Sequence, residues 1–127
     1  MKKVLTLLFA CSLVMTLDVS AAAPICHSSH GGYCTYTGTV KHIYVNSSNL
    51  ILIYFDTPMA ASEPAKAGFS ASKTNAAAFV IGDNPEFAKL FYSTALAAQA
   101  SGRKISIQMR DVYSGYLKFD RIWLAES

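Results

Sequence analysis

The hydrophobic pattern of the chain predicts strands on both sides of one long helix. Apolar and β-branched residues alternate over residues 39–45, and a continuous apolar run covers residues 50–55. Both patterns are typical of strands, and the turn residues 46–49 make the pair a hairpin. The same criteria predict three more strands, at residues 76–81, 104–110 and 117–126.

Two segments carry turn chemistry and are predicted to be loops. Residues 24–35 contain Pro24, two adjacent glycines and several serines and histidines. Residues 56–75 contain Pro58, Pro64 and Gly68 among small and polar residues. A loop of that length in a small domain is often functional.

Residues 85–101 are predicted to form the long helix. Asp83 or Asn84 can cap its first turn, Pro85 suits the first helical position, and Gly102 supplies a left-handed stop. The element order is then strand, strand, strand, helix, strand, strand. This order predicts a mainly β domain with one long helix, a five-stranded OB-fold barrel, which is a fold used mostly for binding.

The two faces of this helix differ from those of an ordinary surface helix. Helical spacing predicts a core face formed by Phe87, Leu90, Phe91, Thr94, Ala95 and Ala98. The opposite face carries little charge, which suits packing against copies of the same chain. We therefore expect Tyr92, Leu96 and Gln99 to line an oligomer interface. The alternative is an alanine-rich surface helix with two isolated exposed apolar residues.

The N-terminus has the three parts of a secretory signal. Lys2 and Lys3 precede an apolar run over residues 4–17, and small residues follow at positions 20–23. We expect a signal peptide at 1–23, a single domain at 24–127, and a secreted or periplasmic protein. A lipoprotein signal ending at Cys11 is the alternative. The apolar run is short for a bilayer span, so no membrane insertion is expected.

Charge and cysteine content narrow the choice of partners. The chain carries a net charge of +3, and cleavage of the predicted signal peptide removes two lysines and one aspartate. The positive charge that remains is too weak to indicate a nucleic-acid partner, so none is expected. Two cysteines remain, Cys26 and Cys34, and an even pair in an exported chain predicts a disulfide. A zinc site that adds His27 and His30 is the alternative, but the spacing matches no usual zinc pattern. We expect no metal and no cofactor.

No catalytic motif competes with a binding role. The acidic residues are scattered, and neither serine nor histidine lies in a nucleophile-elbow context, so we predict that the protein is not an enzyme. Aromatic and hydroxyl residues lie in or beside loops at Tyr33, Tyr36, Thr37, Tyr113 and Tyr116. Aromatic faces beside hydroxyl groups suit a neutral or weakly acidic glycan.

The chain resembles the B subunits of AB5 toxins, nearest the subtilase-cytotoxin and typhoid-toxin type. The resemblance covers residues 36–124 and is most specific over residues 87–109, where an aromatic-led helix runs into an alternating strand. A second point of similarity is Tyr36-Thr37-Gly38-Thr39-Val40, which looks like Tyr-Ser-Asp-x-Val at the start of that family's first strand.

The resemblance implies a homopentameric ring that binds sialylated glycans or glycoproteins of a host and delivers a separate toxin A subunit. In that family the serine of the motif touches the sialic acid, so Thr37, with Tyr36 beside it, is the expected glycan-binding position. The chain departs from the family at Gly38, which replaces the aspartate. Its cysteine pair brackets an N-terminal loop instead of bridging barrel strands. A monomeric periplasmic OB-fold protein that binds a protein or a small ligand is the alternative function.

Overall fold

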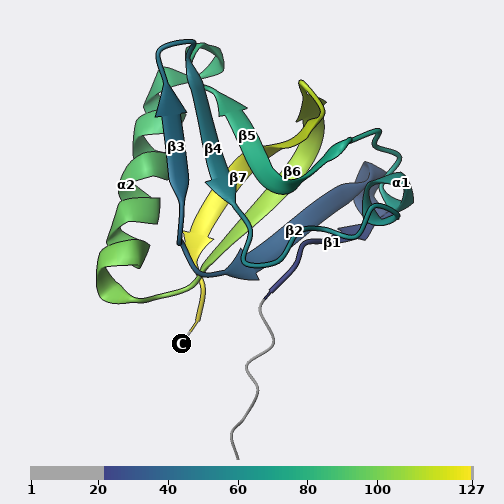
Figure 1. The fold of residues 1–127 in the computed structure, drawn as a ribbon, viewed down its shortest axis with the longest axis horizontal. Helices are drawn as coiled ribbons and strands as arrows, with labels where there is room; N and C mark the ends of the chain where they lie inside the picture. Colours follow the sequence, from purple (N-terminus) through teal and green to yellow (C-terminus); the bar gives the residue numbers. More distant parts are fainter. Residues whose placement is uncertain (1–21, 127) are drawn as a thin grey trace, which may run out of the picture.

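The computed structural model describes residues 22–126. The predicted signal peptide therefore lies outside the described residues, except for Ala22 and Ala23. The described chain is mainly β with one long helix, as the sequence predicts (Figure 1). Its strands are β1 Ile25–His27, β2 Tyr33–Gly38, β3 Ile43–Asn46, β4 Leu50–Tyr54, β5 Lys73–Val80, β6 Ile105–Tyr113 and β7 Tyr116–Leu124. Its helices are α1 Glu63–Lys66 and α2 Pro85–Ser101, with short 3-10 turns at Ser29–Gly31 and Ile81–Asp83.

The described strands form one sheet in the order β1-β2-β6-β7-β5-β4-β3. All neighbours are antiparallel except β5 and β7, which are parallel. This is an open order of seven strands, so the predicted five-stranded barrel is not confirmed. β2 and β3 are consecutive in the chain and are separated only by residues 39–42, yet they pair with opposite flanks of the sheet (Figure 1).

The predicted loop over residues 24–35 is wrong. These residues contain β1 and the first half of β2, which pair antiparallel with Cys26 opposite Cys34. In β2 the residues Cys34, Tyr36 and Gly38 are buried, whereas Tyr33, Thr35 and Thr37 are not. This alternation is that of a half-buried strand. The sequence pattern did not reveal this strand, because two of its three buried positions are cysteine and glycine, which are not typical strand residues.

The remaining strands lie close to their predicted positions but differ at their ends: β3 begins at Ile43 instead of residue 39 and β4 ends at Tyr54, whereas β5 and β6 are longer than predicted. β5 begins at Lys73, and the connection before it contains the short helix α1. β6 and β7 extend to a two-residue hairpin turn in which Ser114 and Gly115 both have positive φ, at 49° and 82°. Glycine at the second position is what such a turn favours.

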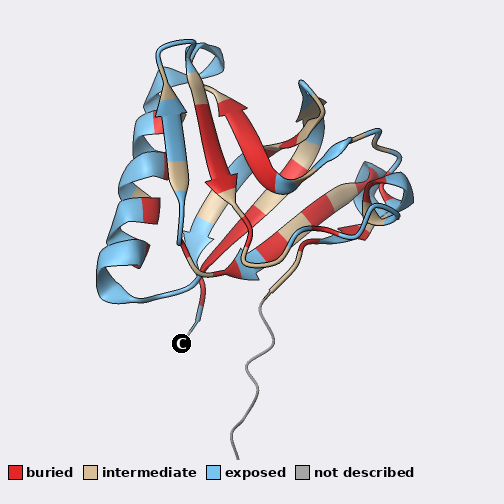
Figure 2. Ribbon diagram, in the orientation of Figure 1, coloured by how far each residue is buried: buried red, intermediate tan, exposed pale blue. Residues whose placement is uncertain are grey.

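The helix α2 has its predicted bounds and ends. The Asn84 side chain accepts a hydrogen bond from the Phe87 N–H at 3.0 Å, and Gly102 ends the helix at φ 68°. One prediction for its core face is wrong, because Leu90 is 67% exposed. The buried residues are Ala88, Phe91, Ala95 and Ala98, and the small side chains of the three alanines let the helix approach the sheet. Figure 2 shows the buried positions of α2 on the side that faces the strands.

The core lies between α2 and the inner face of the sheet. Phe91 of α2 stacks on Phe119 of β7 with ring centroids 3.9 Å apart, and Phe79 of β5 lies 5.5 Å from Phe119. Alternate residues of β4 and β6, among them Ile53 and Ile107, complete this layer with no exposed surface. The opposite, outer face of the sheet carries the polar and tyrosine side chains that form the candidate sites.

Candidate functional site

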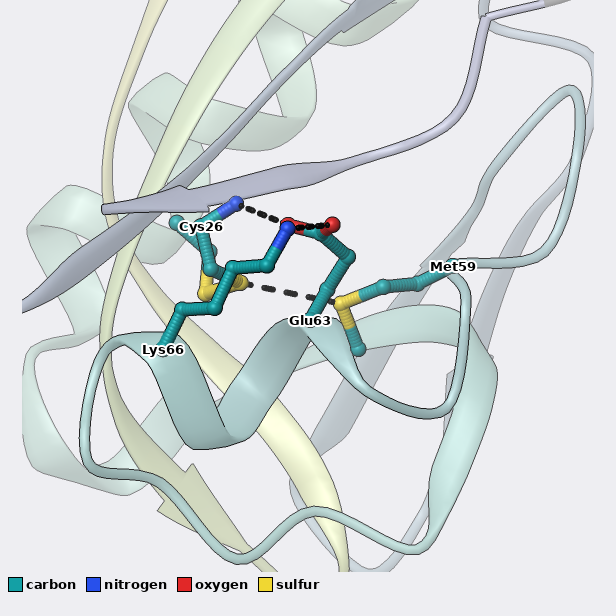
Figure 3. Close-up of a disulfide and its surroundings, with 5 residues drawn as sticks. Cys26, Met59, Glu63 and Lys66 are labelled. Atoms are coloured by element: carbon teal, nitrogen blue, oxygen red, sulfur yellow. Dashed lines mark hydrogen bonds and ion pairs between the residues drawn. A yellow bond between two sulfur atoms is a disulfide. The ribbon is translucent and has the colours of Figure 1, made fainter. Parts of the chain in front are cut away.

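A disulfide joins β1 to β2 and anchors the start of the described chain. Cys26 and Cys34 form this bond, as predicted, and it joins two paired strands across the short connection between them. Glu63 of α1 accepts a hydrogen bond from the Cys26 N–H at 2.9 Å, and Met59 Sδ lies 3.9 Å from Cys26 Sγ (Figure 3). The hydrogen bond from Lys66, followed by that from Cys26, holds the pKa of Glu63 below its usual range. The disulfide, α1 and β2 therefore form one connected unit.

Tyr36 lies in the core and supports the surface from inside. Its side chain is only 1% exposed. The Tyr36 hydroxyl accepts a hydrogen bond from the Asp56 N–H at 2.9 Å and donates one to the Thr39 carbonyl oxygen at 3.3 Å. Tyr36 therefore offers no surface to a ligand, and its part in any site at β2 is to position neighbouring residues.

Asp56 completes this buried cluster. Its carboxylate accepts hydrogen bonds from the Thr39 hydroxyl and, at 3.1 Å, from the Thr39 N–H. Burial acts to raise the pKa of Asp56, but the hydrogen bonds from Thr39 and the charge of Lys41 outweigh it and hold that pKa below its usual range. Burial raises the pKa of Tyr36 well above its usual range. The Tyr36–Thr39–Asp56 cluster thus favours an ionised carboxylate beside a neutral phenol, at the point where β2 leads into β3.

Thr37 is exposed and belongs to a row of side chains across three strands. It faces Ser106 of β6 in register, and Ser106 faces Trp123 of β7. The Thr37 and Ser106 hydroxyl oxygens lie 2.7 Å apart, and Trp123 is 45% exposed. Because residues directly opposite in a sheet share a face, the three side chains form one strip of the outer face, in which Ser106 is only 6% exposed between Thr37 and Trp123. We call this strip the hydroxyl–indole row.

A groove lies beside the row. It has a volume of about 580 Å³ and is lined by Thr35 and Thr37 of β2, by Ile25 of β1 and by Glu63 of α1. The next cross-strand row carries Thr35, Gln108 and Arg121, and it lies on the same outer face. The guanidinium of Arg121 donates to the neighbouring Asp120 carboxylate at 3.2 Å, so its charge is already paired.

The other predicted aromatic residues lie apart from the row. Tyr113 and Tyr116 flank the β6–β7 turn and line a separate hollow of about 400 Å³. Tyr33 packs against His27 and lies 5.3 Å from the Arg110 guanidinium. The structure therefore does not bring the predicted tyrosines together into one site.

Tyr92, Leu96 and Gln99 do lie together. With residues of β3 they line a groove of about 400 Å³ between α2 and the edge of the sheet. Tyr92 and Leu96 are 40% and 39% exposed, and the Gln99 amide donates to the Val40 carbonyl oxygen at 3.2 Å. A second hollow of about 340 Å³, lined almost entirely by carbon, shares Val45 and Tyr92 with this groove.

Sequence reasoning missed Ser106 and Trp123, which accompany Thr37 in the row. The alternating pattern of β6 predicts that Ser106 lies on the outer face, and the structure agrees, although Ser106 is only 6% exposed. Its position beside Thr37 could not be predicted, because cross-strand register depends on pairing between distant segments.

Two other arrangements bear on function, that of a metal site and that of a membrane-spanning helix. Within residues 22–126, no group of three or more His, Cys, Asp or Glu side chains is placed to hold a metal ion. The disulfide occupies both thiols of the zinc alternative. In the same part of the chain, no helix is long and apolar enough to cross a membrane.

No protein-family model matches the chain, and no curated protein and no solved structure shows significant similarity to it.

Proposed function

We propose that this protein is a secreted glycan-binding subunit without enzymatic activity, similar in role to the B subunit of an AB5 toxin. The observation that carries the proposal is the hydroxyl–indole row. The exposed Trp123 indole offers an apolar face to sugar C–H groups, and the exposed Thr37 hydroxyl, which is hydrogen-bonded to the buried Ser106 hydroxyl, offers a hydrogen-bond partner to a sugar hydroxyl. The disulfide is consistent with export, since such bonds persist in oxidising compartments.

The row suits a shallow and individually weak contact. Thr37 and Trp123 lie on a sheet face, and the groove beside them is open to solvent. Small contacts of this kind gain avidity when several copies bind one surface together. A ring of identical subunits would therefore make the site effective.

We further propose that the ring forms through α2 and β3. β3 has a sheet neighbour on one side only, so its other backbone edge is available for pairing. Beside this edge lies the groove with Tyr92 and Leu96, and Val45 of β3 is 49% exposed. A second copy of the chain is the occupant that this combination of a strand edge and apolar side chains favours. A separate toxin A subunit would dock on the assembled ring.

The fold detail that supports this role is the relation of β2 to β3. We propose that they act as one bent strand. Together with β4, β5, β6 and β7 they would then give a five-stranded OB-fold barrel, in which α2 lies between the third and fourth strands. β1 would be a short addition to that barrel.

A glycan array with the mature protein tests the binding proposal. We expect Thr37→Ala to weaken binding about fivefold, the value of one modest hydrogen bond, and Thr37→Ser to retain it. Ser93→Ala, which removes a hydroxyl on α2, is the matched control. A blank array for the wild type, or unchanged binding by Thr37→Ala, would reject the site.

Light scattering after gel filtration tests assembly. We expect a homopentamer that Leu96→Glu dissociates, whereas Leu90→Glu, on the same helix but outside the groove, leaves it intact. A wild-type monomer at micromolar concentration contradicts the ring. It would favour the alternative, a monomeric periplasmic OB-fold protein that binds a protein or a small ligand.

A further inference from the structure

The hollow near the β6–β7 turn is the second site that this fold builds on its outer face. Four tyrosines line it: Tyr44, Tyr54, Tyr113 and Tyr116. Its volume is about 400 Å³, and we call it the tyrosine hollow. It shares no lining residue with the groove beside Thr37.

Small residues of the sheet make room for the hollow. Leu52, Ala76 and Ala78 form a buried cluster on the outer face of β4 and β5, against which Tyr54 and Tyr116 pack. Alanine side chains stand low above the sheet, and tyrosine rings stand high. Leu50 and Leu52 are the aliphatic residues that line the hollow, between one wall of tyrosines from β3 and β4 and another from the β6–β7 hairpin.

The hairpin wall is held in place by the start of β5. The Lys73 N–H donates to the Gly115 carbonyl oxygen at 2.9 Å, and Lys73 pairs with Tyr116 in the parallel ladder. A Cβ atom on Gly115 would lie 2.6 Å from the Ser72 hydroxyl oxygen, so the turn fits closely against this segment. The hairpin wall is therefore preorganised, which reduces the entropy lost on binding.

One cation faces this hollow without a partner of opposite charge. Lys73 Nζ lies 4.5 Å from the centroid of the Tyr116 ring. Among the described residues, no carboxylate lies within ion-pair distance of Lys73, and no Asp or Glu lines the hollow. The ammonium group is thus available to an anionic group of a ligand. Asn46 and Ser114 add neutral hydrogen-bonding groups at the rim.

We propose that the tyrosine hollow binds a sugar that carries a carboxylate. The rings of Tyr44 and Tyr113, which are 45% and 41% exposed, cover the apolar faces of the sugar, and Lys73 pairs with its carboxylate. A single lysine suits one carboxylate better than a chain of phosphates, which would need several cations. The proposal shares with the preceding section the premise that the protein binds saccharides, but it assigns the acidic sugar to a separate site.

The test compares acidic saccharides with their carboxyl-reduced counterparts. Sialyllactose and a glucuronic-acid disaccharide, each in both forms, are titrated into the mature protein by calorimetry. We expect at least one acidic form to bind about tenfold more tightly than its reduced form, the value of one charge-assisted hydrogen bond. Lys73→Met removes that preference. Lys104→Met, which removes the same charge from the exposed residue just before β6, keeps it.

Two further variants separate this site from the hydroxyl–indole row. Tyr113→Ala weakens both forms of the sugar, and because the residue is exposed, the melting temperature reports any effect on folding. Thr37→Ala leaves the preference for the acid unchanged. If wild type does not distinguish the two forms, or binds neither, the proposal is wrong. It is also wrong if Lys73→Met keeps the preference, or if a short single-stranded oligonucleotide competes for the hollow. Loss of binding only in Thr37→Ala would overturn this site and leave the proposed function standing.

Discussion

Replacing Tyr36 by phenylalanine tests whether the buried cluster supports the surface around Thr37. The substitution removes one oxygen atom and keeps the ring, which packs against Phe55 at a centroid distance of 4.9 Å. The lost hydroxyl takes with it two hydrogen bonds, one from the Asp56 N–H and one to the Thr39 carbonyl. The packing of the core is otherwise unchanged.

The structure sets the size of the effect. A buried donor that loses its acceptor costs about 1–3 kcal/mol, and the Asp56 N–H is such a donor. We expect the free energy of unfolding to fall by about 2–3 kcal/mol near neutral pH when the weaker bond to Thr39 is included. For a urea slope of about 1–2 kcal/mol per molar, the unfolding midpoint falls by about 1–3 M.

The pH dependence gives a second, independent signature. Burial raises the pKa of Tyr36 in the folded protein above its unfolded value of about 10. The folded state therefore holds a proton that the unfolded state releases at high pH. The resulting stabilisation is complete below about pH 10 and is lost as pH rises from there toward the folded pKa, by about 1.4 kcal/mol per pH unit. The Tyr36→Phe variant lacks this loss, so its deficit relative to wild type shrinks between pH 9 and pH 11.

Urea unfolding followed by the fluorescence of Trp123 measures both effects. Tyr113→Phe is the control, because it deletes a hydroxyl from a side chain that is 41% exposed. A loss of unfolding free energy below about 0.5 kcal/mol at pH 8 would show that the hydrogen bonds of the Tyr36 hydroxyl contribute little to stability. A deficit that stays constant from pH 8 to pH 11 would refute the claim that this phenol remains protonated because of its burial.

Three other predictions follow from the same region. In the double variant Cys26→Ala/Cys34→Ala the free energy of unfolding should fall by about 2.5 kcal/mol, because the disulfide closes a short loop. Calorimetry should then show a melting temperature about 10–15 °C lower, and a drop under about 3 °C would contradict this. Gly38→Ala should destabilise the fold by about 3 kcal/mol in the same assay, because its Cβ would lie 2.3 Å from the Tyr36 hydroxyl oxygen. Wild-type stability of this variant would show that the Tyr36–Thr39–Asp56 cluster rearranges at little energetic cost. The lowered pKa of Asp56 stabilises the fold above about pH 4 and ceases to do so as pH falls through the folded value, so acid titration should find a flatter decline in Asp56→Asn.

The helix and most strands could be predicted because their signals are local. Asn84, Pro85 and Gly102 mark the ends of α2 within a few residues, and the structure places those ends where the sequence does. Which face of α2 packs against the sheet was harder to predict from the sequence. Leu90 fits the apolar spacing, yet the helix turns Ala88 toward the sheet, because bulky rings already fill the space beneath it.

The candidate sites depend on pairings that no local pattern contains. Thr37 and Trp123 are far apart in the chain and share a row only because β6 lies between β2 and β7 in one register. A shift of one residue would turn either side chain into the core. The tyrosine hollow likewise needs the parallel pairing of β5 with β7, a non-local contact that brings Lys73 to Tyr116.

The Tyr36–Thr39–Asp56 cluster connects the two surfaces. It lies in the short segment where the chain leaves β2, which carries Thr37, and begins β3, which carries Tyr44. The angle between those strands sets where the hydroxyl–indole row lies relative to the tyrosine hollow, and four hydrogen bonds among Tyr36, Thr39 and Asp56 hold the chain at that bend. Trp123 and Tyr116 stand near opposite ends of β7, so one extended saccharide would meet both surfaces only along a path that the bend determines. Loosening the cluster should therefore weaken extended ligands more than single sugars, because each surface keeps its own contacts while their relative position becomes variable.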